Sequence, residues 1–203
     1  DSSFSALLKI YQSENWEFIG NVGVSVPTGS LKKTDEVPMM GETRLPYPMQ
    51  LSSGTWDPHI AVTGKYDVSE HFLLGGQVFY RSPISENDEG YEHGDQLSTS
   101  FWAAIESWRW LSHSLRVEWK WRDDIQGGDR GLDIMPSMNP TADPKNWGGS
   151  WINIHLGTNV VVPSGLFKNH RLAFEVGLPV TQNLHGPQMK REWSATVGWQ
   201  YLF

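Results

Sequence analysis

The stretch LRVEWKWRDD, residues 115–124, constrains the fold of this chain more than any other feature. From Leu115 to Arg122 the odd positions are large and apolar, and every even position carries a charge. Side chains of a β-strand point alternately to opposite faces, whereas a helix would mix the two sets. The stretch therefore predicts a strand with one apolar face and one ionic face.

Such a strand fits two environments. In a soluble sandwich the apolar face is buried and the charges meet water, whereas in a transmembrane barrel the apolar face meets lipid and the charges face a wet lumen. The mean hydropathy is negative, and no run of about 18 apolar residues could form a transmembrane helix. Because barrel strands alternate, a negative hydropathy does not exclude a membrane barrel.

The rest of the composition narrows the class of protein. The net charge is −7 and basic residues are scattered among acids, which argues against a nucleic-acid-binding groove. The absence of cysteine excludes disulfides, thiolate metal sites and cysteine nucleophiles. Eleven tryptophans suit either the aromatic girdles of a membrane barrel or a Trp-rich core or carbohydrate-binding surface. No break in composition divides the chain, so we expect one domain over residues 1–203.

The same alternation recurs along the whole chain. It predicts about nine strands, most of them near the ~9–11 residues that a tilted membrane strand needs and longer than the five or six that are typical of sandwiches. The expected strands cover residues 4–10, 16–26, 59–66, 72–81, 96–106, 115–122, 152–162, 171–178 and 193–203.

The connections between these strands alternate in length. Short connections are expected near residues 11–14, 67–70, 111–114 and 164–169, and long ones over residues 28–56, 82–95, 123–149 and 181–191. Outer-membrane barrels have this asymmetry, with tight periplasmic turns and long outer loops. With long loops outside and short turns in the periplasm, the first and the last strand would both run from the outer side to the periplasmic side. The number of strands in this chain would then be odd, whereas bacterial single-chain barrels have an even number. We therefore expect at least one further strand before Asp1.

The resulting prediction is an all-β, antiparallel up-and-down transmembrane β-barrel of the bacterial outer membrane, with about 10–12 strands in the complete protein and about nine in this chain. Polar side chains of the inward faces would line the lumen. They must pair or be hydrated, because an unpaired charge in a dry interior costs several kcal/mol, roughly. Either a hydrated pore or a paired network that plugs a narrow barrel satisfies this requirement, and a barrel of this size favours the narrow interior. The predicted lumen-lining residues are Glu17, His59, Lys65, Arg81, Glu106, Arg116, Glu118, Lys120, Arg122, His155, Arg171 and Glu175.

Metal binding and catalysis find little support in the sequence. The seven histidines show no metal-binding spacing, and the acidic, glycine-rich segment 123–133 lacks the ligand placement of a calcium loop, so we predict a solvated outer loop and neither metal nor cofactor. A barrel lipid hydrolase would need a serine within reach of a histidine. His113 and Ser114 are adjacent and would face opposite sides, while His59 or His155 with a distant serine stays open. We predict no enzyme and no catalytic residues.

The C-terminal segment WSATVGWQYLF places Trp199, Tyr201 and Phe203 at two-residue spacing. This ending resembles the signal by which the barrel-assembly machinery recognises outer-membrane proteins. The alternative is an ordinary edge strand that ends on phenylalanine. With the preceding pattern, we interpret these three residues as the assembly signal.

Several segments resemble one family, the outer-membrane transporter-like proteins associated with the meta-cleavage pathway of phenol degradation. The matching pieces are VGVSVPTGS, LSSGTWDPHIAVTGKYDVSEHFLLGGQVFY and FEVGLPVTQNLHGPQMKREWSATVGWQYLF, scattered over residues 16–203. The resemblance implies a β-barrel that moves small molecules, aromatic or hydrophobic ones included. It implies no catalytic residues.

Together these observations predict a channel or transporter-like barrel whose partners are outer-membrane lipid, the barrel-assembly machinery and a small-molecule solute. The alternative is a non-conducting structural barrel whose long outer loops bind another envelope protein. A barrel lipid hydrolase is the third and least favoured possibility.

Overall fold

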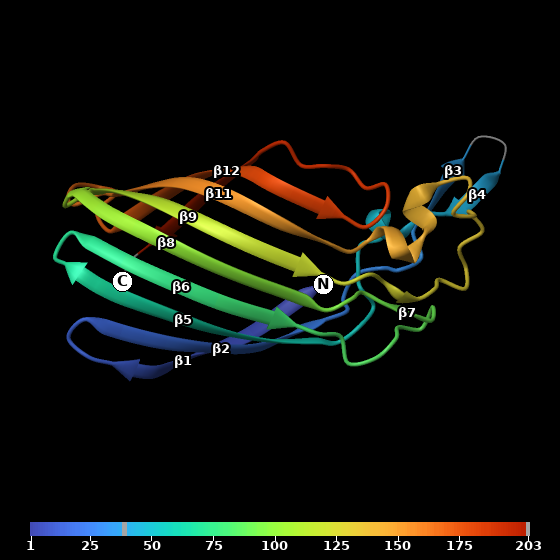
Figure 1. The fold of residues 1–203 in the computed structure, drawn as a ribbon, viewed down its shortest axis with the longest axis horizontal. Coiled ribbons are helices and arrows are strands. Elements are labelled where there is room, and N and C mark those ends of the chain that lie inside the picture. Colours follow the sequence, from blue (N-terminus) through green and yellow to red (C-terminus); the bar gives the residue numbers. More distant parts are fainter. Residues whose placement is uncertain (38–39, 202–203) are drawn as a thin grey trace.

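Nine long strands form one antiparallel sheet in chain order (Figure 1). The computed structural model describes residues 1–37 and 40–201. Each strand pairs with the strands before and after it in this series, so the predicted all-β, up-and-down arrangement and the nine strands are confirmed. Within the described residues, no pairing joins the two edge strands to each other. The strands are β1 (Ser2–Gln12), β2 (Trp16–Val26), β5 (Asp57–Ser69), β6 (Phe72–Arg81), β8 (Gln96–Trp108), β9 (Leu111–Arg122), β11 (Gly149–Val161), β12 (His170–Leu184) and β13 (Ser194–Tyr201).

The two faces of this sheet invert the usual rule of burial. In β11, Asn153 and His155 are buried at 5 % and 7 % exposure, while Ile154 between them is 39 % exposed. On β9 the buried Glu118 likewise lies between the exposed Val117 and Trp119. The face that carries Glu118, Asn153 and His155 is called the inner face below. The sheet therefore buries polar groups and exposes apolar ones, as a membrane barrel does.

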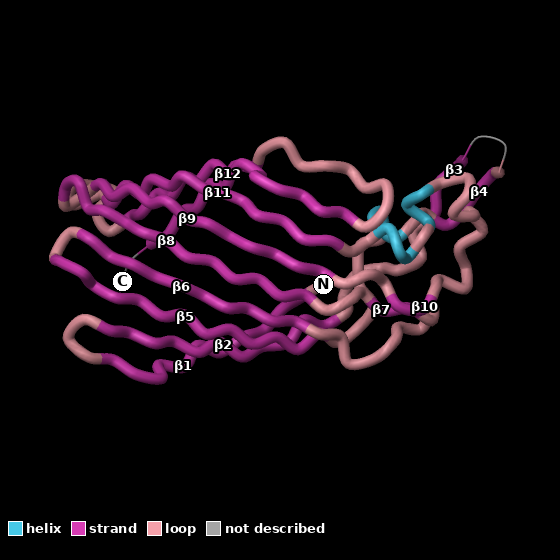
Figure 2. The backbone as a smooth tube through the Cα atoms, in the orientation of Figure 1, coloured by secondary structure: helices cyan, strands magenta, loops and turns pink. Residues whose placement is uncertain are grey.

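The connections are sorted by length, as the sequence predicts. Short turns lie at one end of the sheet and long connections gather at the other (Figure 2). Several strands are longer than predicted, and two of these differences have a clear cause in the pairing. The β8–β9 turn is residues 109–110 because His113 and Ser114 continue the pairing of β9 with β8, and β12 runs on to Leu184 because a register shift opposite Ile152 and Asn153 absorbs the irregularity at Pro179.

The long connections fold together into a small structure of their own, which we call the loop cap (residues 27–56, 82–95 and 123–148, without 38–39). Its core consists of Tyr47, Tyr91 and Ile125, all at most 5 % exposed. No helix in the described part of the chain is long and apolar enough to cross a membrane. The elements of the cap are β3 (Thr34–Val37), β4 (Gly41–Arg44), η1 (Tyr47–Met49), β7 (Tyr91–Glu92), β10 (Gln126–Gly127), η2 (Pro140–Ala142) and η3 (Pro144–Asn146).

Ring packing and ion pairs hold the cap together. The rings of Tyr47 and Tyr91 meet edge to face with centroids 5.0 Å apart. Arg44 forms ion pairs with Glu89 and with Asp129, the second at 2.7 Å. The prediction that segment 123–133 is a solvated outer loop is therefore wrong in part. Asp129 forms an ion pair with Arg44, and the side chain of Ile125 is buried in the core of the cap.

Candidate functional site

A network of charged side chains crosses the inner face over three neighbouring strands. β9 contributes Arg116, Glu118 and Lys120, β11 contributes His155, and β12 contributes Glu175. Arg116 contacts both carboxylates, at 2.5 Å to Glu175 and 3.2 Å to Glu118. Strand register explains this proximity, since Arg116 pairs with His155 and His155 pairs with Gly177, two residues from Glu175.

Glu118 is the centre of this network. Its carboxylate lies 3.1 Å from the ammonium of Lys120 and 3.5 Å from Nε2 of His155, and it accepts a hydrogen bond from the Asn153 amide at 3.2 Å. Nδ1 of His155 is 3.3 Å from Glu175. Charge-assisted contacts therefore surround the acidic groups of this part of the wall, and neither carboxylate is left as a free anion.

The other predicted lumen-lining residues also lie on inner-face positions of the sheet, but in separate groups. Lys65 and Glu17 form an ion pair at 2.7 Å, and Arg81 pairs with the buried Asp57. Arg171 donates to the side chain of Asn159 at 2.8 Å, and the ring of His59 lies 5.7 Å from that of Phe79. Glu106 lies exposed beside the β8–β9 turn, with no ion pair in the described residues. The structure thus brings five predicted residues into one network and leaves the rest in pairs or alone.

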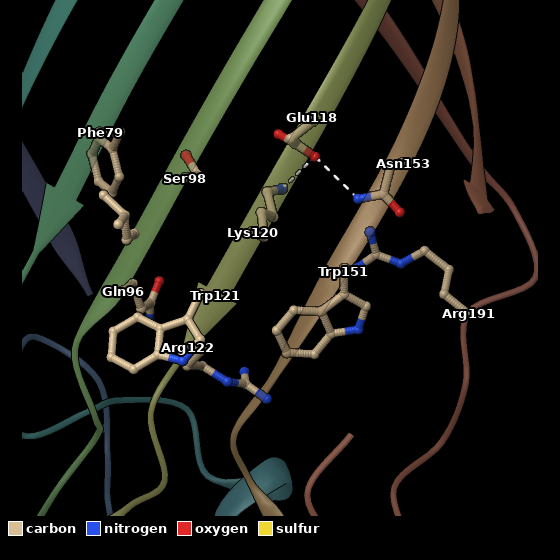
Figure 3. A pocket seen from close by; sticks show the side chains of 11 residues that line it. Phe79, Gln96, Ser98, Glu118, Lys120, Trp121, Arg122, Trp151, Asn153 and Arg191 are labelled. Carbon is tan, nitrogen blue, oxygen red and sulfur yellow. Dashed lines mark hydrogen bonds and ion pairs between the residues drawn. The ribbon is translucent and has the colours of Figure 1, made fainter. Parts of the chain in front are cut away.

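A cavity of about 410 Å³ opens on the inner face where the barrel wall meets the loop cap (Figure 3). The rings of Phe79 and Trp151 and three cations line it together with Glu118 and small polar side chains. Trp121 also borders it, although its position in β9 has the outer-face parity of Val117 and Trp119. Figure 3 shows Arg191 reaching in from the loop before β13. The lining residues are Phe79, Gln96, Leu97, Ser98, Glu118, Lys120, Trp121, Arg122, Trp151, Asn153 and Arg191.

Arg122 connects this cavity with the loop cap. Its guanidinium donates from Nε at 3.0 Å and from Nη2 to the backbone carbonyl of Trp147. The guanidinium carbon lies 4.3 Å from the ring centroid of Trp147 and 5.4 Å from that of Trp151. Cation–π contacts of this kind stabilise a charge that has left bulk water. The last residue of β9 thereby fixes the position of the cap over the wall.

On the cap side of this junction, His93 lies edge to face against Trp147, with centroids 4.8 Å apart. Burial lowers the pKa of His93 to about 4, with a smaller contribution from Arg122. Burial also raises the pKa of Tyr91 to about 12. His93 and Tyr91 are therefore both uncharged at neutral pH.

Metal binding and catalysis remain without a geometric basis among the described residues. No group of three His, Asp or Glu side chains there could hold a metal ion. Carboxylates face both ring nitrogens of His155, and within the described chain no serine hydroxyl hydrogen-bonds to its ring. His113 contacts the hydroxyl of Thr158 rather than Ser114. Among the described residues, no hydrogen bond joins a histidine ring to a serine hydroxyl, the contact that a serine nucleophile and its base would make.

The predicted assembly signal lies on the exposed outer face as far as it is described. Trp199 and Tyr201 are 64 % and 46 % exposed, and the Trp199 indole N–H lies 2.8 Å from Nδ1 of His170. Phe203 lies outside the described residues.

Sequence reasoning missed several residues around the cavity. Trp151 follows the same parity as Asn153 and His155, and this spacing could have placed it on the inner face. Arg191 could not be found in this way because it lies in a loop. The side chain of Gln182 forms two hydrogen bonds with the backbone of Arg191. It accepts one from the Arg191 N–H at 2.9 Å and donates one to the Arg191 carbonyl at 2.8 Å. The strand partner of Trp151 thus positions Arg191 at the cavity.

No known protein family and no curated protein matches this sequence. Among solved structures, the fold is similar to that of an outer-membrane channel from Pseudomonas putida F1, with a TM-score of 0.66 and 12 % sequence identity. The alignment covers 97 % of this chain and 63 % of the channel, so the chain spans less than two thirds of the length of that protein. The chain therefore has the β-barrel fold of an outer-membrane channel.

Proposed function

We propose that this chain forms a barrel channel in the bacterial outer membrane through which small molecules pass. The observation that carries the proposal is the inverted sheet, which exposes Ile154 and Val117 on one face and buries Glu118 and His155 on the other. An exposed apolar face suits hydrocarbon, and a polar inner face suits a hydrated passage. The fold of an outer-membrane channel supports the same function.

Aromatic side chains near the short turns support a membrane location. Trp16 stacks on Phe18 with centroids 5.6 Å apart, and Trp108 stacks on Trp110 at 5.7 Å. Amphipathic rings favour the boundary between lipid and water, and barrels carry girdles of them there. We assign these rings to the periplasmic girdle, and Trp199 and Tyr201, with Phe203, to recognition by the barrel-assembly machinery.

Polar passage requires water between the charged groups of the inner face. The ion pairs of Glu118, Glu175 and Lys65 narrow the interior, while the cavity beside Trp151 provides open space next to the cap. A narrow pore that admits single small solutes follows from this combination. The resemblance to the transporter-like proteins of phenol degradation supports solutes that include small aromatic or hydrophobic molecules.

A non-conducting structural barrel is the second candidate function, and the folded loop cap favours it. The core of Tyr47, Tyr91 and Ile125, with the ion pairs of Arg44, makes the cap a rigid cover rather than a set of loose loops. Such a cover could bind another envelope protein while the barrel stays closed. A lipid hydrolase is less favoured, since His155 contacts carboxylates and no serine.

Planar-bilayer recording of the purified barrel separates these functions. Heat-modifiable gel mobility first shows that the barrel is folded. Stepwise ion currents are then expected for a channel, and a folded but silent barrel would establish the structural alternative. Release of labelled fatty acid from phospholipid vesicles would instead reveal a hydrolase.

A further inference from the structure

Two guanidinium groups face the wall cavity without an acidic partner. In the described part of the chain, no carboxylate lies within ion-pair distance of Arg122 or Arg191, although both line the cavity. The acid in the lining, Glu118, is already bound by Arg116, Lys120 and Asn153. Arg122 is partly buried, and a charge that loses hydration without a counter-charge is costly, while Arg191 is exposed and keeps much of its hydration. The cavity therefore has an excess of positive charge, which favours an anion.

The aromatic lining indicates the shape of that anion. The indole of Trp151 and the ring of Phe79, both at inner-face positions, give the cavity flat apolar surfaces beside the cations. Rings prefer to pack against other rings or against planar guanidinium groups. A volume of about 410 Å³ lies at the lower end of the range for small-molecule pockets, roughly 300–1,000 Å³, which suits a solute with a single ring.

The two arginines retain free donors for a carboxylate. Arg122 uses Nε and Nη2 on the carbonyl of Trp147, so the remaining N–H groups are available. Gln182 holds the backbone of Arg191 in place and leaves its guanidinium free to point into the cavity (Figure 3). Guanidinium groups bind carboxylates through paired, charge-assisted hydrogen bonds.

We propose that this cavity is a binding site for small planar carboxylates, compounds with one flat ring and one anionic carboxyl group. The carboxylate binds Arg191 and Arg122, and the ring lies against Trp151 and Phe79. This inference rests on the proposed function, because it names the class of solute that the channel selects at the point where the wall meets the cap.

Equilibrium dialysis with radiolabelled benzoate on the detergent-solubilised, folded barrel tests the site without any need for transport. Saturable binding is expected. Benzyl alcohol, which keeps the ring, and acetate, which keeps the charge, should each compete at least roughly tenfold less well, because the first lacks the charge-assisted hydrogen bonds to the arginines and the second lacks the ring contacts. Equal competition by benzyl alcohol, or by inorganic phosphate, would overturn the planar-carboxylate site.

Charge-removing variants test which side chains bind the carboxylate. Arg191→Gln should weaken benzoate binding roughly tenfold or more, and Arg191→Lys should retain part of the affinity. Lys190→Gln is the matched control, since it removes the same charge one residue away and Lys190 does not line the cavity. An equal loss in both Gln variants refutes the assignment. Arg122→Gln should also weaken benzoate binding, and this variant is used only if its gel mobility shows a folded barrel. If it does not fold, Arg191→Gln alone tests the assignment.

Bilayer recording separates this inference from the proposed function. Saturable benzoate binding to a silent barrel would refute the channel and support the site. A conducting barrel in which benzoate neither binds nor blocks current more than benzyl alcohol would overturn the site and support the channel.

Discussion

The barrel wall and the loop cap of this protein bury opposite kinds of side chain. In the wall, polar groups such as Glu118 and His155 are buried and apolar ones such as Ile154 are exposed. In the cap, Tyr91 is completely buried and the charged side chain of Lys32 is 64 % exposed, as in a water-soluble domain. In the proposed outer-membrane barrel, this difference would place the boundary between lipid and water near the long-loop ends of the strands, close to Arg122.

The strongest test of this contrast is removal of the cap core. Tyr91→Ala deletes a ring with 0 % exposure that packs on Tyr47, and comparable large-to-small changes cost about 3–5 kcal/mol. The loss should be confined to the cap, because the wall is held by its own strand pairing. We expect faster hydrogen exchange and proteolysis in residues 82–95 with unchanged heat-modifiable mobility. Met49→Ala, at an exposed site of the same cap, should change neither, and unfolding of the whole barrel in Tyr91→Ala would show that the two regions are one unit.

The next largest effect tests the outer face of the wall. Val117 is 42 % exposed between two inner-face residues of β9. A charge on the lipid face near the membrane centre costs about 2–4 kcal/mol, so Val117→Arg should lower the unfolding free energy in lipid vesicles by that amount. Val117→Leu, which stays apolar, should leave it within about 0.5 kcal/mol. Equal stability of the two variants would mean that Val117 does not contact lipid.

These two regions also differ in how far the sequence predicts them. The wall follows from the period of two, since Val117 and Glu118 are assigned to opposite faces by position alone. The loop sorting and the nine strands follow from the same pattern. Errors in the strand boundaries arise where alternation continues into a turn, as at His113 and Ser114, or where a register shift interrupts it, as beside Pro179.

The cap has no such period. Tyr47, Tyr91 and Ile125 come from three loops and meet only in the folded structure. The cavity is intermediate, because strand parity places Lys120 and Trp151 but only the contact with Gln182 places Arg191. Contacts between distant, irregular segments leave no periodic trace in a sequence, so the cap core and the place of Arg191 in the candidate site could not be predicted.

Acidification should weaken the cap but not the wall. Burial depresses the pKa of His93 from 6.5 to about 4, with Arg122 adding to the shift and Asp57 opposing it. Between these pH values the unfolded cap binds more protons than the folded cap, so its stability falls as the pH decreases from 6.5 towards 4. At about 1.4 kcal/mol per pKa unit, the loss is at most about 3.5 kcal/mol.

Hydrogen exchange of cap amides at pH 7 and pH 5 measures this loss. Other acids of the cap also titrate, so the comparison is between the wild type and His93→Asn, whose cap should depend less on pH over this interval. A wild-type slope no steeper than that of the variant would contradict the role of His93.

The smallest expected effect concerns the inner face of the wall. Lys120 contacts Glu118 at 3.1 Å, but its side chain is 46 % exposed, and Arg116 and Asn153 still bind Glu118 when the lysine is lost. Exposed ion pairs contribute about 0–1 kcal/mol, so Lys120→Gln should change the unfolding free energy by less than about 1 kcal/mol. Its effect should instead appear in reversal potentials under a salt gradient, which shift towards cation preference because a positive charge beside the passage is gone. Lys168→Gln, in the turn at the opposite end, should leave the reversal potential unchanged. If Lys120→Gln destabilises the barrel as much as Val117→Arg, then both faces of β9 are packed against protein, and the contrast between the wall and the cap is lost.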